Sequence, residues 1–155
     1  MTVQILSAVI GVFAFAVLFH APRRSYLCCA LCGGICWGSY LLFASLGLTE
    51  FLASTLAVLV LTLAARVLSV AMALPATTFV VCGIFPIVPG AGIYHTAYAL
   101  MINDMAAFGS YGVETVSLAG AIAIGIVVGM GIPAIVPRAL GRGLGRLLPA
   151  FMRRR

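Results

Sequence analysis

The stretch Pro86-Ile87-Val88-Pro89-Gly90-Ala91-Gly92, followed by Ile93-Tyr94-His95, lies within an apolar segment that runs from about residue 75 to residue 102. Neither proline can donate a backbone N–H, and the residue before each proline is disfavoured in helical geometry. Non-helical backbone is stable inside a bilayer only where protein or a wet cavity surrounds it. The stretch therefore predicts a helix broken at mid-membrane, which is typical of transporter binding sites. A proline kink that only shapes packing is the alternative.

The composition places the whole chain in a membrane. Of its 155 residues, 64% are hydrophobic and 8% are charged, and the mean hydropathy is +1.24. A soluble domain of this composition would have to cover its exterior with apolar residues. At about 20 residues per crossing, the chain has room for roughly four to six membrane helices and no soluble catalytic domain. We expect an all-α polytopic membrane bundle that is not an enzyme, and that needs no cofactor and binds no nucleic acid.

The cysteines are expected to pack as small apolar side chains. All five lie within apolar stretches: Cys28, Cys29, Cys32, Cys36 and Cys82. The Cys29-x-x-Cys32 spacing is compatible with redox or metal chemistry, but the sequence has no second pair and no nearby histidine. The sequence likewise lacks the paired nucleophile and base, or the two neighbouring carboxylates, of an intramembrane enzyme. We therefore expect no catalytic residue and no metal site.

The hydrophobic pattern predicts about five crossings, with the fourth broken by the Pro-x-x-Pro-Gly element. The first apolar run lacks the features of a cleaved signal peptide and is expected to remain as the first membrane helix. The Tyr111-Gly112-Val113-Glu114 stretch is expected to lie in the loop before the last helix. The predicted helices are approximately 3–19, 25–46, 51–73, 76–102 with a break at 86–91, and 115–136.

The arginines define a predicted orientation. Arg23 and Arg24 follow the first helix, and Arg138, Arg142 and Arg146 follow the last one. With five crossings and the N-terminus outside, all of these residues lie on the cytoplasmic side, as the positive-inside rule requires. A re-entrant fourth segment would instead place the basic tail outside. The tail, residues 138–155, is expected to lie on anionic lipid as a basic helix, with a disordered basic tail as the alternative.

Two Gly-x-x-x-Gly faces are expected to let helices approach closely. They are Gly34 with Gly38 and Gly125 with Gly129, and we expect such notches to favour partner helices over lipid. Trp37 is expected to pack between helices. Arg66 is expected to extend toward the cytoplasmic headgroups, with an anion-attracting position in an inner cavity as the alternative.

The second half of the broken helix is the candidate solute site. It starts near Gly90, Ala91 and Gly92, and its free N–H groups carry about half a positive charge that favours an anion such as a carboxylate. His95 lies about one turn further and either contributes a hydrogen bond or a proton, or bonds to a neighbouring helix. Tyr94 is a candidate for lining the same cavity with Tyr98, although simple packing also explains this pair.

Three stretches resemble one known family. Residues 17–24, the glycine-rich second helix, and Pro75 and Phe79 leading into residues 84–90 are similar to the small subunit of the bacterial threonine/serine exporter family. The similarity covers nearly the whole chain. Its most specific part is Pro-x-x-Pro-Gly, which carries Pro86, Pro89 and Gly90 across as site residues. Neither His95 nor the basic tail belongs to this similarity.

The resemblance implies an inner-membrane exporter that works with a larger membrane subunit. In this family two-component members are associated with dicarboxylates such as succinate, and single-chain members with threonine and serine. The implied solute is thus a small carboxylate-bearing metabolite. A membrane subunit that only holds the larger partner in place is the alternative function, and it predicts that straightening the break leaves transport intact.

Overall fold

The computed structural model describes residues 2–133, which form helices and no strand. Arg138, Arg142, Arg146 and the rest of the tail lie outside this range. The elements in chain order are α1 Thr2–Leu18, η1 Arg23–Ser25, α2 Tyr26–Ser45, α3 Glu50–Met72, α4 Ala76–Gly83, η2 Phe85–Ile87, α5 Gly90–Met101 and α6 Met105–Gly131.

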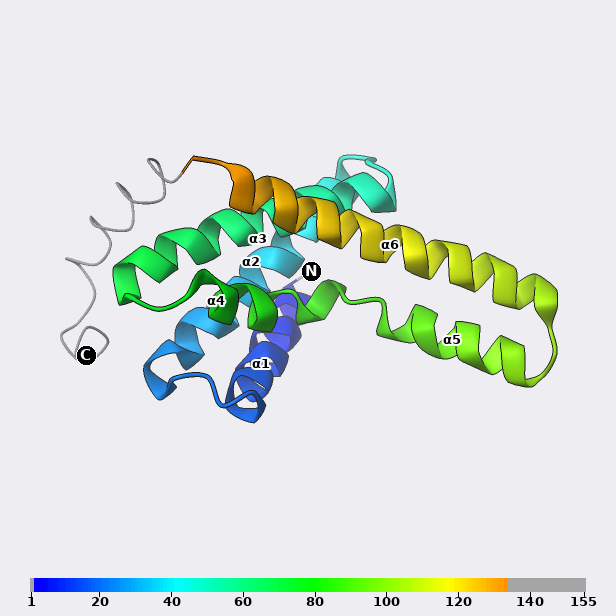
Figure 1. Ribbon diagram of the computed structural model, residues 1–155, viewed down its shortest axis with the longest axis horizontal. Helices are drawn as coiled ribbons and strands as arrows, with labels where there is room; N and C mark the ends of the chain where they lie inside the picture. The colour runs from blue at the N-terminus through cyan, green and yellow to red at the C-terminus, as the bar shows by residue number, and fades with distance from the viewer. Residues whose placement is uncertain (1, 134–155) are drawn as a thin grey trace.

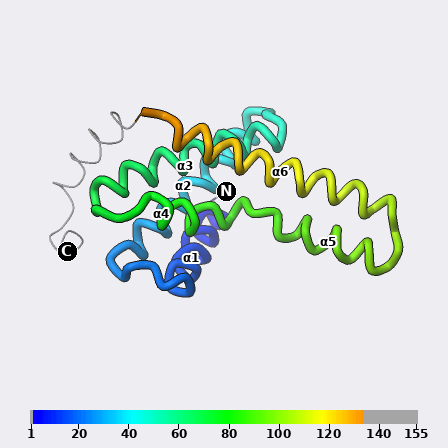
Figure 2. Tube along the Cα trace, viewed as in Figure 1, coloured from blue at the N-terminus to red at the C-terminus, as the bar shows by residue number. Residues whose placement is uncertain are grey.

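The helices form a bundle from which one hairpin extends. α2 packs between α1 and α3, while α4 lies against α2 and α3, and α6 runs along α3. Figure 1 shows α5 and the first part of α6 side by side, extending away from the other helices. The trace in Figure 2 shows the same arrangement, with the chain leaving the bundle after α4 and returning along α6. The bundle core contains Phe79, Leu61 and all five cysteines, and each of these side chains is fully or almost fully buried.

Residues 2–133 contain three helical segments that are long and apolar enough to cross a membrane, namely 23–45, 50–72 and 105–131. A fourth candidate exists if α4 with η2 and α5 count as one broken span, whose halves are bent by 56°. The polytopic helical fold is thus confirmed. α1 has 17 residues and is shorter than the three candidate spans. The expected five crossings, which require α1 to cross, therefore remain a prediction.

The last helix differs most from its predicted bounds. It begins at Met105 and ends at Gly131, whereas the sequence pattern predicted about 115–136. The expected loop at Tyr111–Glu114 is therefore helical. The physical reason is the cap: the Asp104 carboxylate accepts a hydrogen bond from the Ala107 N–H at 3.0 Å, which satisfies one of the free donors of the first turn.

The break also lies slightly earlier than predicted. α4 ends at Gly83, a short 3₁₀ turn covers Phe85–Ile87, and α5 already begins at Gly90, whereas the sequence placed the break at 86–91. We call residues 84–89 the break. Phe15 of α1 stacks on Phe85 with ring centroids 3.4 Å apart, so the first helix holds this irregular segment in place.

Both glycine faces are filled by helices of this chain. A Cβ at Gly34 would lie 2.7 Å from the Val9 side chain of α1, and one at Gly125 would lie 2.8 Å from the Thr55 carbonyl of α3. Such distances leave no room for any side chain larger than hydrogen. The notches therefore serve packing within the chain. The expectation that they are open to helices of a partner is wrong, because helices of this chain already fill them.

Arg66 of α3 lies at the interface with α6. Its Nη1 donates hydrogen bonds to the carbonyl oxygens of Gly129 at 2.8 Å and Ile132 at 2.6 Å. The last carbonyls of a helix lack intrahelical donors, and they attract a positive charge. Arg66 thus caps the end of α6, which neither of the two expectations for this residue anticipated.

The register of α3 against α6 shows how far the hairpin extends. Gly125 faces Val58, and Gly129 faces Thr62 one turn later. By this register, the first roughly twelve residues of α6 lie beyond the start of α3, a distance of about 18 Å at about 1.5 Å per residue. We call α5 and this part of α6, residues 90–116, the hairpin.

Candidate functional site

A cavity of about 330 Å³ lies where the hairpin meets the bundle. Its walls come from α2, α3, the break, α5 and α6, and we call it the central cavity. The residues that line it are Trp37, Tyr40, Glu50, Ser54, Pro86, Ile87, Val88, Pro89, Gly90, Ala91, Gly92, His95, Tyr111, Glu114, Thr115 and Leu118. The irregular segment singled out by the sequence therefore forms one wall of the cavity.

The start of α5 presents free backbone donors to this cavity. The Gly90 N–H bonds to the Val88 carbonyl at 2.7 Å, and the Ile93 N–H bonds to the Pro89 carbonyl at 3.0 Å. Between them, the N–H groups of Ala91 and Gly92 have no acceptor among the described residues. Pro89 directly precedes this helix start and has no N–H to add. Two unpaired donors at a helix N-terminus are the arrangement that binds anions in many proteins.

Six of the seven predicted site residues line the central cavity: Pro86, Pro89, Gly90, Ala91, Gly92 and His95. Gly92 also faces α6, because an added Cβ would lie 2.5 Å from the Thr115 hydroxyl, whereas a Cβ at Gly90 would meet nothing within 4 Å. The seventh, Tyr94, does not line the cavity. It is 64% exposed and stacks on Tyr98, with ring centroids 6.2 Å apart.

His95 lies among aromatic side chains within the hairpin. Its ring stacks on Tyr111 of α6 at a centroid distance of 5.2 Å and meets Tyr94 edge-on at 5.4 Å. On the opposite wall, Trp37 stacks on Tyr40 at 5.2 Å. Trp37 therefore stacks on a residue of its own helix and also lines the cavity, whereas the sequence predicted packing between helices.

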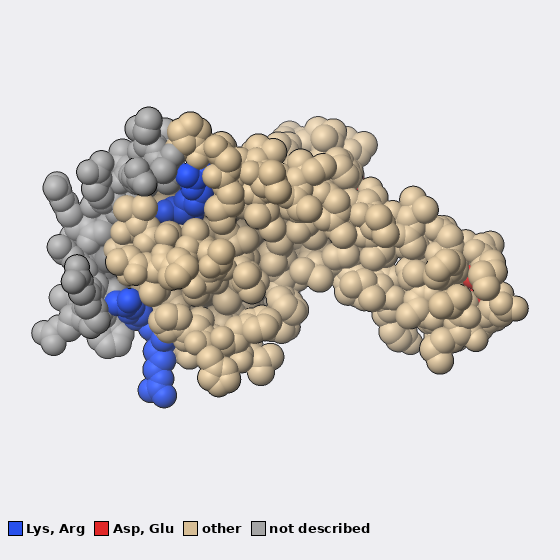
Figure 3. Space-filling model, in the orientation of Figure 1, with Lys and Arg blue, Asp and Glu red and all other residues tan. Residues whose placement is uncertain are grey.

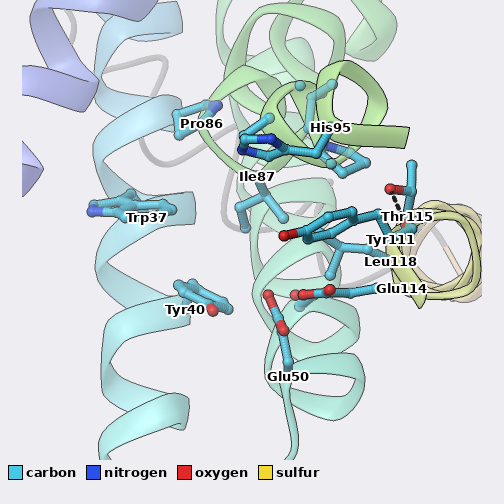
Figure 4. A pocket seen from close by; sticks show the side chains of 16 residues that line it. Trp37, Tyr40, Glu50, Pro86, Ile87, His95, Tyr111, Glu114, Thr115 and Leu118 are labelled. Atoms are coloured by element: carbon cyan, nitrogen blue, oxygen red, sulfur yellow. Dashed lines mark hydrogen bonds between the residues drawn. The ribbon is translucent and has the colours of Figure 1, made fainter. Parts of the chain in front are cut away.

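The residues that sequence reasoning missed are mainly polar. The sequence did not indicate Glu50 or Glu114 as site residues, because Glu50 directly precedes a predicted helix and Glu114 lies in a predicted loop. In the structure both line the cavity, together with Ser54 and Tyr40. Figure 4 shows Pro86, Ile87 and His95 toward one end of this site and the two glutamates at the other end. Recognising Asp104 as an N-cap would have placed Glu114 on a helix face.

The charges of the described part of the chain are separated. Figure 3 shows the arginine side chains at one end of the molecule and an acidic side chain near the tip of the hairpin at the other. Among residues 2–133, no arginine or lysine lines the central cavity beside Glu50 and Glu114, and Arg66 donates to backbone carbonyls at the end of α6. Within the described residues, the acidic side of the central cavity therefore has no basic side chain in its lining.

The cysteines lie away from the central cavity, in the bundle. All five are buried and form no disulfide, and the Cys29 thiol lies 3.9 Å from the Thr78 carbonyl of α4. Among the described residues, no group of three or more histidine, cysteine or acidic side chains is placed to hold a metal ion. The five cysteines lie on α2 and α4, where they pack as small side chains in the bundle core.

The fold and this site define a class: a polytopic helical membrane protein with a cavity beside a bent pair of apolar helices. A family model described as Threonine/Serine exporter, ThrE, matches residues 4–132. The chain therefore belongs to this family of exporters. Comparisons with curated proteins and with solved structures give no match.

Proposed function

We propose that this chain is a subunit of a bacterial inner-membrane exporter and that the central cavity is its solute site. The observation that carries the proposal is the pair of unpaired N–H groups, at Ala91 and Gly92, which face a cavity beside a broken span. A helix start can hold a carboxylate without a full positive charge stored in the membrane. The solute is a small carboxylate-bearing metabolite, either an amino acid such as threonine or serine, or a dicarboxylate such as succinate.

The size of the cavity supports a small solute. Its volume of about 330 Å³ lies at the lower end of the range for small-molecule pockets. Aromatic and aliphatic walls, with a few polar groups at the ends, are the usual composition of such pockets. The cavity therefore suits a metabolite of a few carbon atoms.

The hairpin supports a role for the larger membrane subunit. Its apolar side chains are strongly exposed: Met101 is 85% exposed, and Val113 and Val116 are 73% and 72% exposed. These residues lie beyond the start of α3, where the other described helices do not cover them. We propose that the larger subunit covers this hairpin, and with it the open side of the central cavity.

The charge separation supports the proposed orientation. The arginine side chains of the described residues lie on the side of the molecule opposite the hairpin tip (Figure 3). By the positive-inside rule, this side faces the cytoplasm. The N-terminus and the hairpin tip then face outward, and the basic tail after α6 lies at the cytoplasmic leaflet, where anionic lipid attracts it.

Solute protection of a single introduced thiol tests the site. Ala91→Cys places a thiol in the cavity wall at an exposed position, while the five native cysteines are buried and are expected to react slowly. In membranes that contain both subunits, a maleimide should label this variant, and the transported solute should slow the labelling.

The matched control is Met101→Cys, which carries an exposed thiol near the tip of the hairpin. Its labelling should be equally fast with and without solute, since Met101 does not line the cavity. Unchanged labelling of the Ala91 variant at saturating solute, in membranes that show export, would place the solute site elsewhere. The scaffold function would then be the better explanation.

A further inference from the structure

The acidic pair Glu50 and Glu114 is the feature of the central cavity that carboxylate binding leaves unexplained. Glu50 is the first residue of α3, and Glu114 lies on α6. Both line the cavity, and Figure 4 shows their side chains pointing toward one another. Two carboxylates that line one site repel one another. A positive charge bound between them, either a proton or a cationic group of a ligand, relieves this repulsion.

Ser54 provides an independent sign of a ligand beside this pair. It follows Glu50 by one helical turn, is completely buried, and its Oγ has no hydrogen-bond partner. Thr62, two turns further along the same helix, is equally buried, but its hydroxyl donates to the Val58 carbonyl at 2.8 Å. An unpaired buried hydroxyl is costly. Ser54 also lines the cavity, so this unpaired hydroxyl belongs to a residue in the same wall as Glu50.

The other titratable groups that line the cavity are two tyrosines and one histidine. They are Tyr40 of α2, Tyr111 of α6 and His95 of α5. In the part of the chain that the structure describes, no lysine or arginine lines the cavity. His95 lies toward the opposite end, next to the break. The cavity thus has an end that favours an anion, at the start of α5, and an end that favours a cation, at the two glutamates.

We propose that Glu50, Glu114 and Ser54 form a cation subsite that holds the ammonium group of a zwitterionic amino acid, and that takes a proton when the ammonium leaves. The inference rests on the proposed function, because the substrate carboxylate must lie at the N–H groups of Ala91 and Gly92. A zwitterion matches both ends of the cavity. A dicarboxylate would bring a second negative charge to the acidic end and is disfavoured there.

The subsite couples export to proton entry. On the outer side, the amino acid departs with its ammonium protons, and the carboxylate pair takes up one proton from the outside water. On the inner side, the pair releases this proton to the cytoplasm, and the next ammonium group takes its place. Each positive charge that leaves as ammonium is then replaced by one proton, and the acidic pair is never left without a counter-charge.

Glutamine variants test the assignment with little change of shape. Glu50→Gln and Glu114→Gln are made in the complete exporter with its larger subunit, and labelled serine and succinate are used as probes in membrane vesicles. Each variant should lower serine transport by roughly tenfold or more and flatten its pH dependence. Succinate transport should be unchanged or higher, because a negative charge has been removed. Ser54→Ala should weaken serine binding severalfold, with a smaller effect on succinate.

Asp104→Asn is the matched control, because Asp104 is an acid of the same hairpin region that does not line the cavity, and asparagine is also a good helix cap. Serine transport that is unchanged in both glutamine variants, or that falls together with succinate transport, would overturn the proposal. If a variant fails to assemble, serine and succinate binding to the purified Ser54→Ala complex decides the question. Protection of Ala91→Cys from maleimide by serine is measured separately. Protection there, together with unchanged serine transport in the glutamine variants, would support the solute site and contradict the cation subsite.

Discussion

Three glycines, Gly90 and Gly92 of α5 and Gly120 of α6, allow a test that separates blockage of the solute site from loss of helix packing. Gly90 lines the cavity, and an added Cβ there meets nothing within 4 Å. Leucine in this position adds four carbon atoms, on the order of 100 Å³ in a close-packed setting, to a cavity of about 330 Å³. Gly90→Leu should therefore fill about a third of the site without disturbing the bundle.

The cost to binding follows from the groups that the leucine covers. A carboxylate at the Ala91 and Gly92 N–H groups makes two charge-assisted hydrogen bonds, each worth about 1.5–3 kcal/mol. Losing both, about 3 kcal/mol or more, corresponds to a decrease in affinity of about 100-fold. Measured as solute export from cells that express both subunits, transport by Gly90→Leu should be close to background.

Two comparison variants decide the interpretation. Gly120→Leu on α6 also meets nothing within 4 Å and lies outside the cavity lining, so it should export normally. Gly92→Leu forces a Cβ to 2.5 Å from the Thr115 hydroxyl, and overpacking of this kind costs about 1–3 kcal/mol, so its protein level should fall. The reasoning is refuted if Gly90→Leu exports within about twofold of wild type at equal protein levels, a margin far below the expected loss.

Further predictions follow from the break, the α6 cap and the hairpin. Pro86→Ala with Pro89→Ala should let the 56° bend relax toward a straight helix and reduce export; full export would favour the scaffold function. Arg66→Met should lower the thermal midpoint of the purified complex by several degrees, because two carbonyls lose a charged donor. Solute affinity should be unchanged, and a selective loss of affinity would contradict the capping role. His95→Ala should lower the export rate or change its pH dependence, and transport identical to wild type at all pH values would restrict His95 to packing. The purified chain without the larger subunit should not export solute in liposomes, and robust export would disprove the need for a partner.

The sequence predicts the membrane class, the first three helices and the break because each depends on local chemistry. Apolar runs of sufficient length, with prolines and arginines between them, define these elements without knowledge of the tertiary contacts. Predicted and observed bounds differ by only one or two residues for α1, α2 and α3. The Pro86–Gly92 wall of the cavity was found for the same reason, since proline and glycine act on their own backbone.

The rest of the site depends on tertiary contacts that the pattern does not contain. Glu50 and Glu114 are 64 residues apart in the chain, and only the parallel register of α3 and α6 brings them to one cavity. That register is set by Gly125 and Gly129 against Val58 and Thr62. A Gly-x-x-x-Gly motif predicts close approach of helices but does not specify the partner, which here is a helix of the same chain.

The extension of α6 relates the hairpin to the site. Had this helix begun near residue 115, Glu114 would lie in a loop, and most of α5 would have no neighbouring helix to pack against. Because α6 begins at Met105, its second and third turns form the wall of the central cavity that faces the break, and Tyr111 and Glu114 lie on it. A subunit that binds the exposed side of the hairpin would therefore act directly on this wall. Under the proposed function, the same contact that assembles the exporter also determines how far the solute site is open.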